Sequence, residues 1–551
     1  MKKLQKFLLV ILVICQIEGL CQVSSTPNYE ELLFITSPRS FFVSGENVHL
    51  SAFSLNKKTL KKSSVSKVGY LVVLNEEREV VHQSKFELRN GRGAIKLFVK
   101  SDYPTGHYYV LGFTSLMKNQ PIEDFYYKEI SVINPFIPYK NPEEESPSLF
   151  PDVSNESNSS IQVEMKKGTY SIREKVDFSI KTEINTDLSI NVFQLDSFNE
   201  PIRSFPSIVN QHLQKAKNKA EPQRLTYFPE TKGELLSGFI KGGSEDAEYP
   251  LKVFASFPGK EFSFFTSILN NQTDTFHITL PYNLFTDELT ISSPDCKECT
   301  FDIIEKFLSD YSFVATNPLK ISDDQLDLLL ERSIKSQVEN AYYNIKTTTA
   351  QKSTFLAFYG KPDHVYNLED YTLFRKMDEV FKEITPSISL RKDESGNYVI
   401  RAVGDQRKII ENPLVLLDGR LVTDINKLLE VDARDISKIE TTPRKYHLGP
   451  QEFNAIISIF SKTGDMNLSD EISNKAYQGV IPYHEFSFNQ RNKNTPELGQ
   501  ILYWKPIEKV GEKPNNYSFR ISDVAGKYMI LIEGFDIYGN PISKSQTFIV
   551  E

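Results

Sequence analysis

Two cysteines that lie three positions apart carry the most specific chemistry in the sequence. Cys296 and Cys299 occur as Asp-Cys-Lys-Glu-Cys-Thr, after a strand-like stretch at 289–291 and Pro294. A redox-active pair requires its first cysteine at a helix N-terminus, which lowers the thiol pKa, and this setting is different. A structural zinc site requires about four ligands, and no histidine is near in sequence. The pair is therefore a candidate local disulfide across a turn, as expected in an oxidising compartment.

No arrangement of residues indicates catalysis or a bound cofactor. No two histidines lie within five positions of one another, so a His-Glu-x-x-His metal pair is absent. A P-loop, a Gly-x-Gly-x-x-Gly motif and a Gly-x-Ser-x-Gly elbow are absent as well. A triad or a carboxylate pair assembled from distant residues stays an alternative, because such sites are recognised by geometry. We predict a protein that is not an enzyme, with no catalytic, cofactor-binding or metal residue. The histidines are His49, His82, His107, His212, His277, His364, His447 and His484.

The first 21 residues have the features of a secretory signal peptide. Three lysines within the first six residues precede an apolar stretch at 7–15, which is too short to span a bilayer. Gly19 and Cys21 occupy the −3 and −1 positions of a cleavage site before Gln22. Lipid attachment is the weaker interpretation, because it requires a small residue before the cysteine and Cys21 follows Leu20. The sequence therefore predicts an exported protein.

Composition favours β-structure over helical bundles. The chain has 551 residues, of which 12% are aromatic, with 38 Phe, 26 Tyr and a single Trp. Because Phe and Tyr suit half-buried strands, the composition predicts a mainly β, multidomain protein. With the strand and helix patterns described below, we predict tandem immunoglobulin-like β-sandwiches, one α/β unit and a C-terminal β-sandwich. A formal net charge of −8 argues against a nucleic-acid partner. No apolar run after residue 21 approaches 18 residues, so we expect no transmembrane segment in the mature chain.

Turn signals and changes of hydrophobic period divide the mature chain. Asn90-Gly91 predicts a hairpin between strands at 85–88 and 94–99. An amphipathic helix that includes Leu329, Leu330 and Ile334 and a second helix at 374–384 mark a mixed unit. The predicted division is a first β-sandwich at 22–134, a Pro/Glu/Ser-rich linker at 135–160, a second β-sandwich with a helical excursion at 161–232, a third β-sandwich at 233–302, a helical lead-in and α/β unit at 303–465, and a C-terminal β-sandwich at 466–551.

An ordered set of stretches lies within the α/β unit. It comprises the helix at 374–384, a strand at 398–404, Pro413-Leu-Val-Leu-Leu-Asp-Gly-Arg-Leu-Val, Asp435-Ile-Ser-Lys-Ile-Glu440 and a closing strand at 453–462. This order resembles the plug domain of TonB-dependent outer-membrane receptors, and the resemblance makes Asp418, Gly419 and Glu440 markers of that fold. Asp-Gly is also a tight-turn signal. The apolar run at 414–417 predicts a strand buried on both faces.

The sequence departs from a complete receptor in two ways. A receptor barrel of about 22 strands at ~10 residues each requires at least ~220 residues, and 86 residues follow Asp465. Ala402-Val403 interrupts the Arg-Gly step of the plug pattern, and we see no TonB-box segment near the mature N-terminus. The resemblance therefore implies a plug-like unit that engages a partner rather than a transporter.

The two ends of the chain carry a second resemblance. The stretches are Phe42-Val-Ser-Gly-Glu-Asn-Val-His-Leu-Ser-Ala, Asp102-Tyr-Pro-Thr-Gly-His-Tyr-Tyr-Val-Leu-Gly-Phe-Thr, Leu502-Tyr-Trp-Lys-Pro506 and Gly526-Lys-Tyr-Met-Ile-Leu-Ile-Glu-Gly534. The first two are similar to the macroglobulin-type β-sandwich of the alpha-2-macroglobulin superfamily. Together with the plug-like unit, the whole resembles Bacteroidota envelope proteins that combine these domains without a barrel. A thioester of the Cys-Gly-Glu-Gln type is absent, so no protease trap is implied.

These observations predict an envelope protein without catalytic activity, in the periplasm or on the periplasmic or outer face of the outer membrane. It would be a scaffold or accessory subunit whose plug-like unit engages an outer-membrane protein or complex. The alternative is a surface adhesin or glycan-binding protein, because the strands at 526–550 are similar to a type IX secretion sorting domain and exposed tyrosines could stack on sugars. The sequence names no small-molecule ligand.

Overall fold

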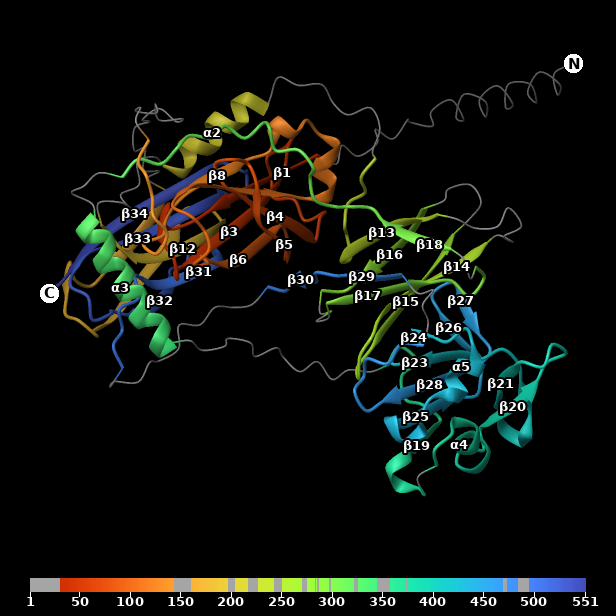
Figure 1. Cartoon of the computed structure of the whole chain (residues 1–551). Helices are drawn as coiled ribbons and strands as arrows, with labels where there is room; N and C mark the ends of the chain where they lie inside the picture. Colours follow the sequence, from red (N-terminus) through yellow and green to blue (C-terminus); the bar gives the residue numbers. More distant parts are fainter. Residues whose placement is uncertain are drawn as a thin grey trace, which may run out of the picture.

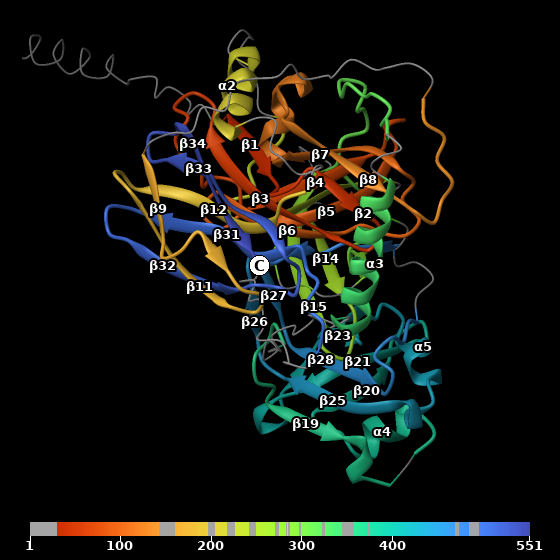
Figure 2. The same cartoon turned by 90° about the vertical axis from the view of Figure 1, so that its left-hand side faces the viewer.

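The computed structural model describes residues 30–142, 160–196, 204–216, 226–241, 250–269, 275–282, 284, 287–296, 299–321, 326–343, 357–372, 374–468, 473–483 and 495–551. The predicted signal peptide at 1–21 and residues 143–159 of the predicted linker lie outside these ranges. Three β-sandwiches and one α/β unit make up the described chain, so the mainly β, multidomain fold is confirmed (Figures 1 and 2). No helix in these ranges combines the length and the apolar character that a membrane span requires.

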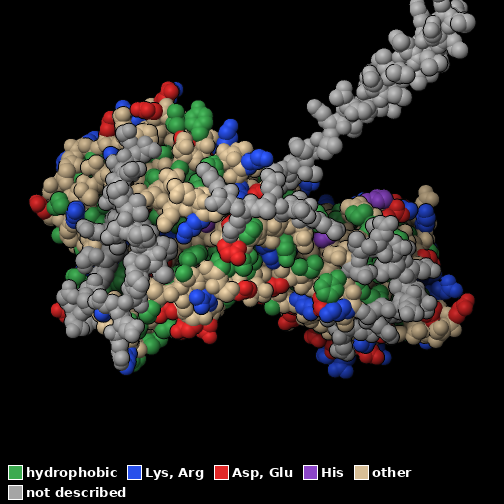
Figure 3. Space-filling view, turned by 90° about the horizontal axis from the view of Figure 1, so that it is seen from above, with side chains coloured by type: hydrophobic (Ala, Val, Ile, Leu, Met, Phe, Trp, Pro, Cys, Tyr) green, Lys and Arg blue, Asp and Glu red, His purple; other side chains and the backbone are tan. Residues whose placement is uncertain are grey.

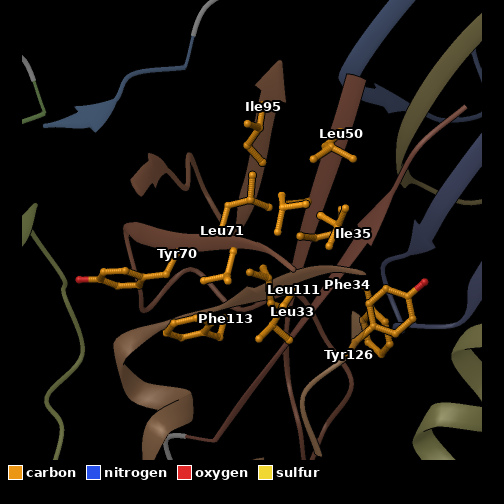
Figure 4. Packing of buried hydrophobic residues seen from close by; sticks show 14 of the residues in the cluster. Leu33, Phe34, Ile35, Leu50, Tyr70, Leu71, Ile95, Leu111, Phe113 and Tyr126 are labelled. Carbon is orange, nitrogen blue, oxygen red and sulfur yellow. The ribbon is translucent and has the colours of Figure 1, made fainter. Parts of the chain in front are cut away.

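The first sandwich packs a three-stranded sheet against a larger one. Its sheets have the orders β1-β3-β6 and β2-β8-β7-β4-β5-β30. Leu33, Leu71 and Leu111 meet in the core between the two sheets (Figure 4). The strands are β1 (Glu31–Thr36), β2 (Phe41–Val43), β3 (Asn47–Asn56), β4 (Val68–Leu74), β5 (Val80–Glu87), β6 (Arg92–Phe98), β7 (Gly106–Phe113), β8 (Tyr127–Ile133) and β30 (Val480–Ile481).

The Asn90-Gly91 turn is present, but it does not close the predicted hairpin. Both residues have positive φ, 51° and 72°, and the backbones of Arg89 and Arg92 bond each other across them. The flanking strands β5 and β6 then enter different sheets. A Cβ on Gly91 would lie 1.8 Å from the Ser63 carbonyl oxygen. The turn therefore links the two layers of the sandwich. An Asn-Gly turn suits this link as well as a hairpin, so the turn residues alone could not tell the two apart.

The second sandwich is built from two distant parts of the chain, which differs from the predicted division. Its sheets have the orders β10-β34-β33-β12-β31 and β32-β11-β9. The predicted separate sandwiches at 161–232 and 466–551 therefore form one body, because β12 pairs on one side with β31 and on the other with β33. The strands are β9 (Ile161–Met165), β10 (Thr169–Tyr170), β11 (Lys175–Thr182), β12 (Thr186–Gln194), β31 (Ile501–Val510), β32 (Asn515–Arg520), β33 (Gly526–Asp536) and β34 (Pro541–Val550).

Buried side chains fix the first and second sandwiches to each other. Trp504 on β31 is fully buried, and its Nε1 donates to Ser51 Oγ at 3.3 Å while its ring contacts that of His49. The predicted helical excursion is α2 (Phe205–Ala216), which packs Phe205 and Val209 on the core of the first sandwich. The two sandwiches therefore pack directly against each other through buried side chains.

The third sandwich also takes a strand from downstream. Its sheets have the orders β16-β13-β18 and β15-β14-β17-β29. After β29, the chain continues to β30 in the first sandwich, so residues 473–481 tie the two sandwiches together. The strands are β13 (Glu234–Lys241), β14 (Leu251–Phe257), β15 (Ser263–Leu269), β16 (Thr275–Leu280), β17 (Glu288–Ser292), β18 (Thr300–Ile303) and β29 (Ser473–Ala476).

The predicted lead-in helix belongs to the first sandwich rather than to the α/β unit. It is α3 (Leu326–Tyr343), and its Arg332 donates to both carboxylate oxygens of Glu46 at 2.9 Å and to Asp196 at 3.1 Å. Burial alone would raise the pKa of Glu46, but the guanidinium groups of Arg332 and Arg39 lower it to about 2. Leu330 and Ile334, expected on the buried face, are more than half exposed. The ion pair of Arg332 holds this helix together with Leu329, which is buried against Phe41 and Ile133.

The α/β unit spans 357–468 and lies at the opposite end of the molecule from α3 (Figure 1). Its main sheet has the order β19-β25-β28-β23-β24, and a second sheet has the order β20-β21-β22. The elements are β19 (His364–Asn367), α4 (Met377–Glu383), β20 (Ile388–Lys392), β21 (Tyr398–Val403), β22 (Ile409–Ile410), β23 (Leu414–Leu417), β24 (Arg420–Leu421), α5 (Ile425–Glu430), β25 (Ile436–Thr442), β26 (Tyr446–Leu448), β27 (Gln451–Phe453) and β28 (Ile456–Ser461).

Two buried carboxylates occupy the joint between the first and third sandwiches. Tyr70 of β4 donates its hydroxyl to both oxygens of Glu230, at 2.9 and 3.0 Å, and Leu235 N donates to Oε1. Burial raises the pKa of Glu230 to about 7, even though Leu235 N–H and the Lys306 ammonium act to lower it. The neighbouring Glu234 acts to raise that pKa further.

Of the two carboxylates, Glu234 has its negative charge better balanced by neighbouring groups. Lys85 Nζ of β5 lies 2.6 Å from its Oε1, and the Tyr477 hydroxyl, from the segment that follows β29, donates to Oε2 at 2.7 Å. Three parts of the chain therefore meet on this pair of carboxylates. Among the described residues, no cation bonds Glu230 directly.

We predict that this joint weakens as the pH rises. The pKa of Glu230 is about 7 in the folded protein and 4.5 when unperturbed, so the folded state holds the proton longer. Stability is therefore full below the unperturbed pKa and falls by about 3 kcal/mol as the pH rises through 7. Urea unfolding measures the free energy of unfolding between about pH 5 and pH 8. This free energy should fall less steeply with pH for Glu230→Gln than for the wild type.

Glu394→Gln, an exposed change in the turn after β20, is the matched control and should keep the wild-type decline. Glu533 on β33 contributes a decline of the same sign, since burial raises its pKa to about 7 against the lowering effect of Lys128. The free energy of unfolding of the double variant Glu230→Gln/Glu533→Gln should therefore depend less on pH than that of either single variant. An unchanged slope in Glu230→Gln contradicts the assignment.

Candidate functional site

The main sheet of the α/β unit is buried on both faces, as the apolar run at 414–417 predicts. All four residues of β23 are at most 6% exposed. Val415 and Leu417 pack with α4 and α5, in the cluster that contains Val380 and Leu428. Leu414 and Leu416 point to the other side, where they pack against aromatic residues of the third sandwich. One face of the sheet is therefore the unit's own core, and the other is its attachment surface.

Asp418 closes β23 and organises the end of β28. Its φ is 48°, and its carboxylate accepts hydrogen bonds from Ser461 N at 2.8 Å, from Ser461 Oγ at 2.5 Å and from Met466 N at 2.9 Å. Its carbonyl oxygen accepts from Gly259 N of the third sandwich at 3.2 Å. The side chain is fully buried, with its acceptors satisfied by the protein. Asp418 therefore holds a turn in place and has no access to a substrate.

Gly419 is one of the residues through which the α/β unit contacts the third sandwich. Its φ is +86°, and a Cβ at this position would lie 2.5 Å from Phe262 Cβ. Ser256 Oγ donates to the Gly419 carbonyl at 2.5 Å. The fit leaves no room for a side chain, and the conformation favours glycine. The Asp-Gly pair is thus part of an interface inside the protein.

Glu440 is a buried structural carboxylate on β25. It accepts from the Tyr359 hydroxyl at 2.7 Å and pairs with Lys438 Nζ at 2.6 Å. Burial, reinforced by the Glu440 charge, raises the pKa of Tyr359 well above its ordinary value. Among the described residues, no three or more His, Cys, Asp or Glu side chains gather as metal ligands would. The three fold markers, Asp418, Gly419 and Glu440, stabilise the unit and do not form a reactive centre.

Cys296 and Cys299 form a disulfide in the third sandwich. The bridge lies between β17 and β18, and Cys299 is buried in the core with Phe301 and Leu289. Its apolar cluster is separate from the aromatic cluster that receives the α/β unit, although Glu288 of β17 pairs with Arg420 of that unit. The bridge closes a loop of the sandwich, and neither sulfur is a free thiol.

Sequence patterns did not identify the residues that receive the α/β unit. Phe254, Phe262 and Phe264 of the β14–β15 hairpin form one cluster with Leu414 and Leu416. Five phenylalanines lie between positions 254 and 265. So many phenylalanines are more than one buried face of a hairpin requires. Their number was the feature of the sequence from which a second buried face could have been predicted.

The α/β unit carries a cleft of about 400 Å³. The turn between β20 and β21 forms one wall, and the segment from β24 into α5 forms the other. Leu421 of the second wall also belongs to the cluster around Phe262, so this wall begins beside the attachment surface. The first wall, with Asp393 and Asn397, is exposed.

No protein-family model matches the chain, and no curated protein matches it. Among solved structures, a point mutant of Salmonella alpha-2-macroglobulin aligns with 96% of this chain and 40% of its own length, at 10% identity and a TM-score of 0.25. Native Escherichia coli alpha-2-macroglobulin aligns with 96% of this chain and 40% of its own length, at 9% identity and the same TM-score, 0.25. The Escherichia coli adhesin FdeC aligns with 47% of this chain and 58% of its own, at 10% identity and a TM-score of 0.14.

The chain thus spans less than half the length of the alpha-2-macroglobulins with which it aligns. At such low TM-scores, the alignments assign neither a family nor a function to this chain.

We predict that Gly419→Ala loosens the α/β unit from the third sandwich. The positive φ costs about 1–2 kcal/mol for any L side chain, and the overlap with Phe262 adds roughly 1–3 kcal/mol. Gly396→Ala is the matched control, because its φ is +85° and nothing lies within 4 Å of the added Cβ. Urea unfolding, with hydrogen exchange of 254–265 and 414–421, should show the larger loss in Gly419→Ala. Equal losses in the two variants would refute the close contact.

Proposed function

We propose that this protein is an exported envelope scaffold without catalytic activity, whose α/β unit engages an outer-membrane transport or assembly complex. The observation that carries the proposal is the way in which the unit is mounted. One face of its sheet is fixed to the third sandwich through Phe254, Phe262 and Phe264, and the end of the unit that bears β19, α4 and β20 points away from the sandwiches (Figure 1). A module held in this way can present its free end to a partner without losing its own fold.

The order of elements in the unit supports the same proposal. The plug-like succession of α4, β21, β23 with its Asp418–Gly419 turn, β25 and β28 occurs in one compact body. Strands downstream of residue 468 return to the sandwiches: β29 to the third, β30 to the first and β31 to the second. The partner that a plug-like unit implies would therefore come from another chain.

Surface charge is consistent with a protein partner. On the face shown in Figure 3, acidic and basic side chains are interspersed, without a broad area of one sign. Electrostatic attraction of a polyanion requires a broad area of positive charge. A partner would instead be recognised through mixed polar contacts and strand edges, of which β19 is one at the edge of the main sheet.

Site-specific photocrosslinking in native envelopes tests this proposal. A photoreactive amino acid replaces Val365 on β19 or Ile409 on β22, which are 48% and 42% exposed. Tyr538, in the β33–β34 turn of the second sandwich and 58% exposed, is the matched control position. We expect an adduct with an outer-membrane protein from position 365 or 409, identified by mass spectrometry, and none from 538.

Two results would overturn the proposal. One is the absence of an adduct from both α/β positions, and the other is the same adduct from all three positions, which would show contact without preference for the unit. Protease treatment of intact cells separates the adhesin alternative. A protein that faces the periplasm should be protected, whereas a surface adhesin should be cleaved.

A further inference from the structure

The cleft of the α/β unit has walls of two different kinds. Leu421, Val422 and Leu468 supply apolar surface, and Tyr398 supplies an aromatic ring. The remaining lining is polar and includes the side chains of Asp393, Asn397, Thr423, Asp424, Asn426 and Lys427. Its volume of about 400 Å³ is at the small end of the range found for ligand-binding clefts, which is about 300–1,000 Å³. Such a space suits one or two small rings rather than a folded domain.

Hydrogen bonds fix the two walls relative to each other. Asn426 accepts from Tyr398 N at 3.1 Å through Oδ1 and donates from Nδ2 to Asn397 Oδ1 at 3.3 Å. Asp424 Oδ1 accepts from Asn426 N at 2.9 Å and caps α5. Asp393 Oδ1 accepts from Asn397 N at 2.9 Å and holds the opposite turn. A ligand would therefore meet a pre-organised site, which lowers the entropy cost of binding.

Each wall keeps polar groups that the described chain does not use. Asp393 and Asp424 each have a second carboxylate oxygen, and Asn397 has its amide Nδ2, without a partner among the described residues. These groups can accept from and donate to hydroxyls at the same time. Lys392 Nζ lies 4.9 Å from the centre of the Tyr398 ring and occupies one face of it. Only the other ring face could stack on a ligand.

We propose that this cleft binds a neutral saccharide. Adjacent hydroxyls both donate and accept, and they match paired carboxylate and amide groups; the apolar face of a sugar ring matches leucine, valine and tyrosine. Asp393 and Asp424 are balanced by Lys427 and by Lys392 beside Tyr398, so the charges at the cleft favour neither an anionic nor a cationic sugar over a neutral one. The proposal goes beyond the scaffold function and does not rest on it, because the cleft can bind a glycan whether or not a protein partner exists.

The test uses the mature chain, residues 22–551, on an array that carries cello-, xylo-, malto- and chitohexaose with sulfated and uronic glycans as acidic counterparts. Isothermal titration then measures the affinity for the strongest neutral ligand. We expect Asn397→Ala and Asp424→Asn each to weaken binding by about tenfold, because each removes or neutralises a group that bonds a hydroxyl. Asparagine also caps helices, so Asp424→Asn should keep α5 folded.

Tyr371→Ala is the matched control, since Tyr371 is an exposed tyrosine of the same unit that does not line the cleft. The affinity of this variant for the neutral ligand should equal that of the wild type. Ligand binding should also slow hydrogen exchange at 393–399 and 421–427. Absence of any neutral ligand, binding restricted to acidic glycans, or wild-type affinity in both cleft variants would each overturn the proposal. Loss of binding in Tyr371→Ala would do so as well, by placing the site elsewhere.

Discussion

The pairing of β12 with both β31 and β33 is the constraint on which the architecture depends. It places Thr186 opposite Val510 on one side and Asp536 on the other, so the second sandwich is complete only when distant segments meet. Everything from 195 to 500 is then an insertion into that sandwich. The pairing of β17 with β29 repeats this plan inside the first insertion, since the chain between β18 and β29 is an insertion into the third sandwich. The α/β unit is the innermost insertion.

The joints between these bodies use two kinds of chemistry. The contact of the α/β unit with the third sandwich is aromatic and close-packed around Gly419 and Phe262. Two joints with the first sandwich bury charges, where Arg332 of α3 pairs with Glu46 and Glu234 of the third sandwich pairs with Lys85. Buried ion pairs add little net stability, but loss of one partner is costly, roughly 3–5 kcal/mol. These charged joints therefore favour one arrangement of the bodies over others.

Local patterns in the sequence predicted local structure well. The strand at 414–417 and the strand at 398–403 coincide with β23 and β21, because apolar runs and alternation report burial directly. The division into domains was less successful, because a reading along the chain assumes that neighbouring strands pair. Nothing in the stretch 186–194 indicates that its partners lie beyond residue 500. The candidate site shows the same limit: Asp418-Gly419 was visible as a turn, but Phe262, which decides what the turn does, is remote in sequence.

The nested insertions also set an order of events during synthesis. At about 5–20 residues per second, the partners of β12 emerge on the order of tens of seconds after β12 itself. Throughout this interval both edges of β12 lack the strands that flank them in the finished sheet, and open edges promote association between chains. The inner bodies can finish first, and the second sandwich can close only when the last fifty residues arrive. Strands β31 to β34 thus complete a sandwich whose first strands, β9 to β12, are made much earlier, so a chain shortened at these strands would lose the second sandwich while the inserted bodies keep their own strands.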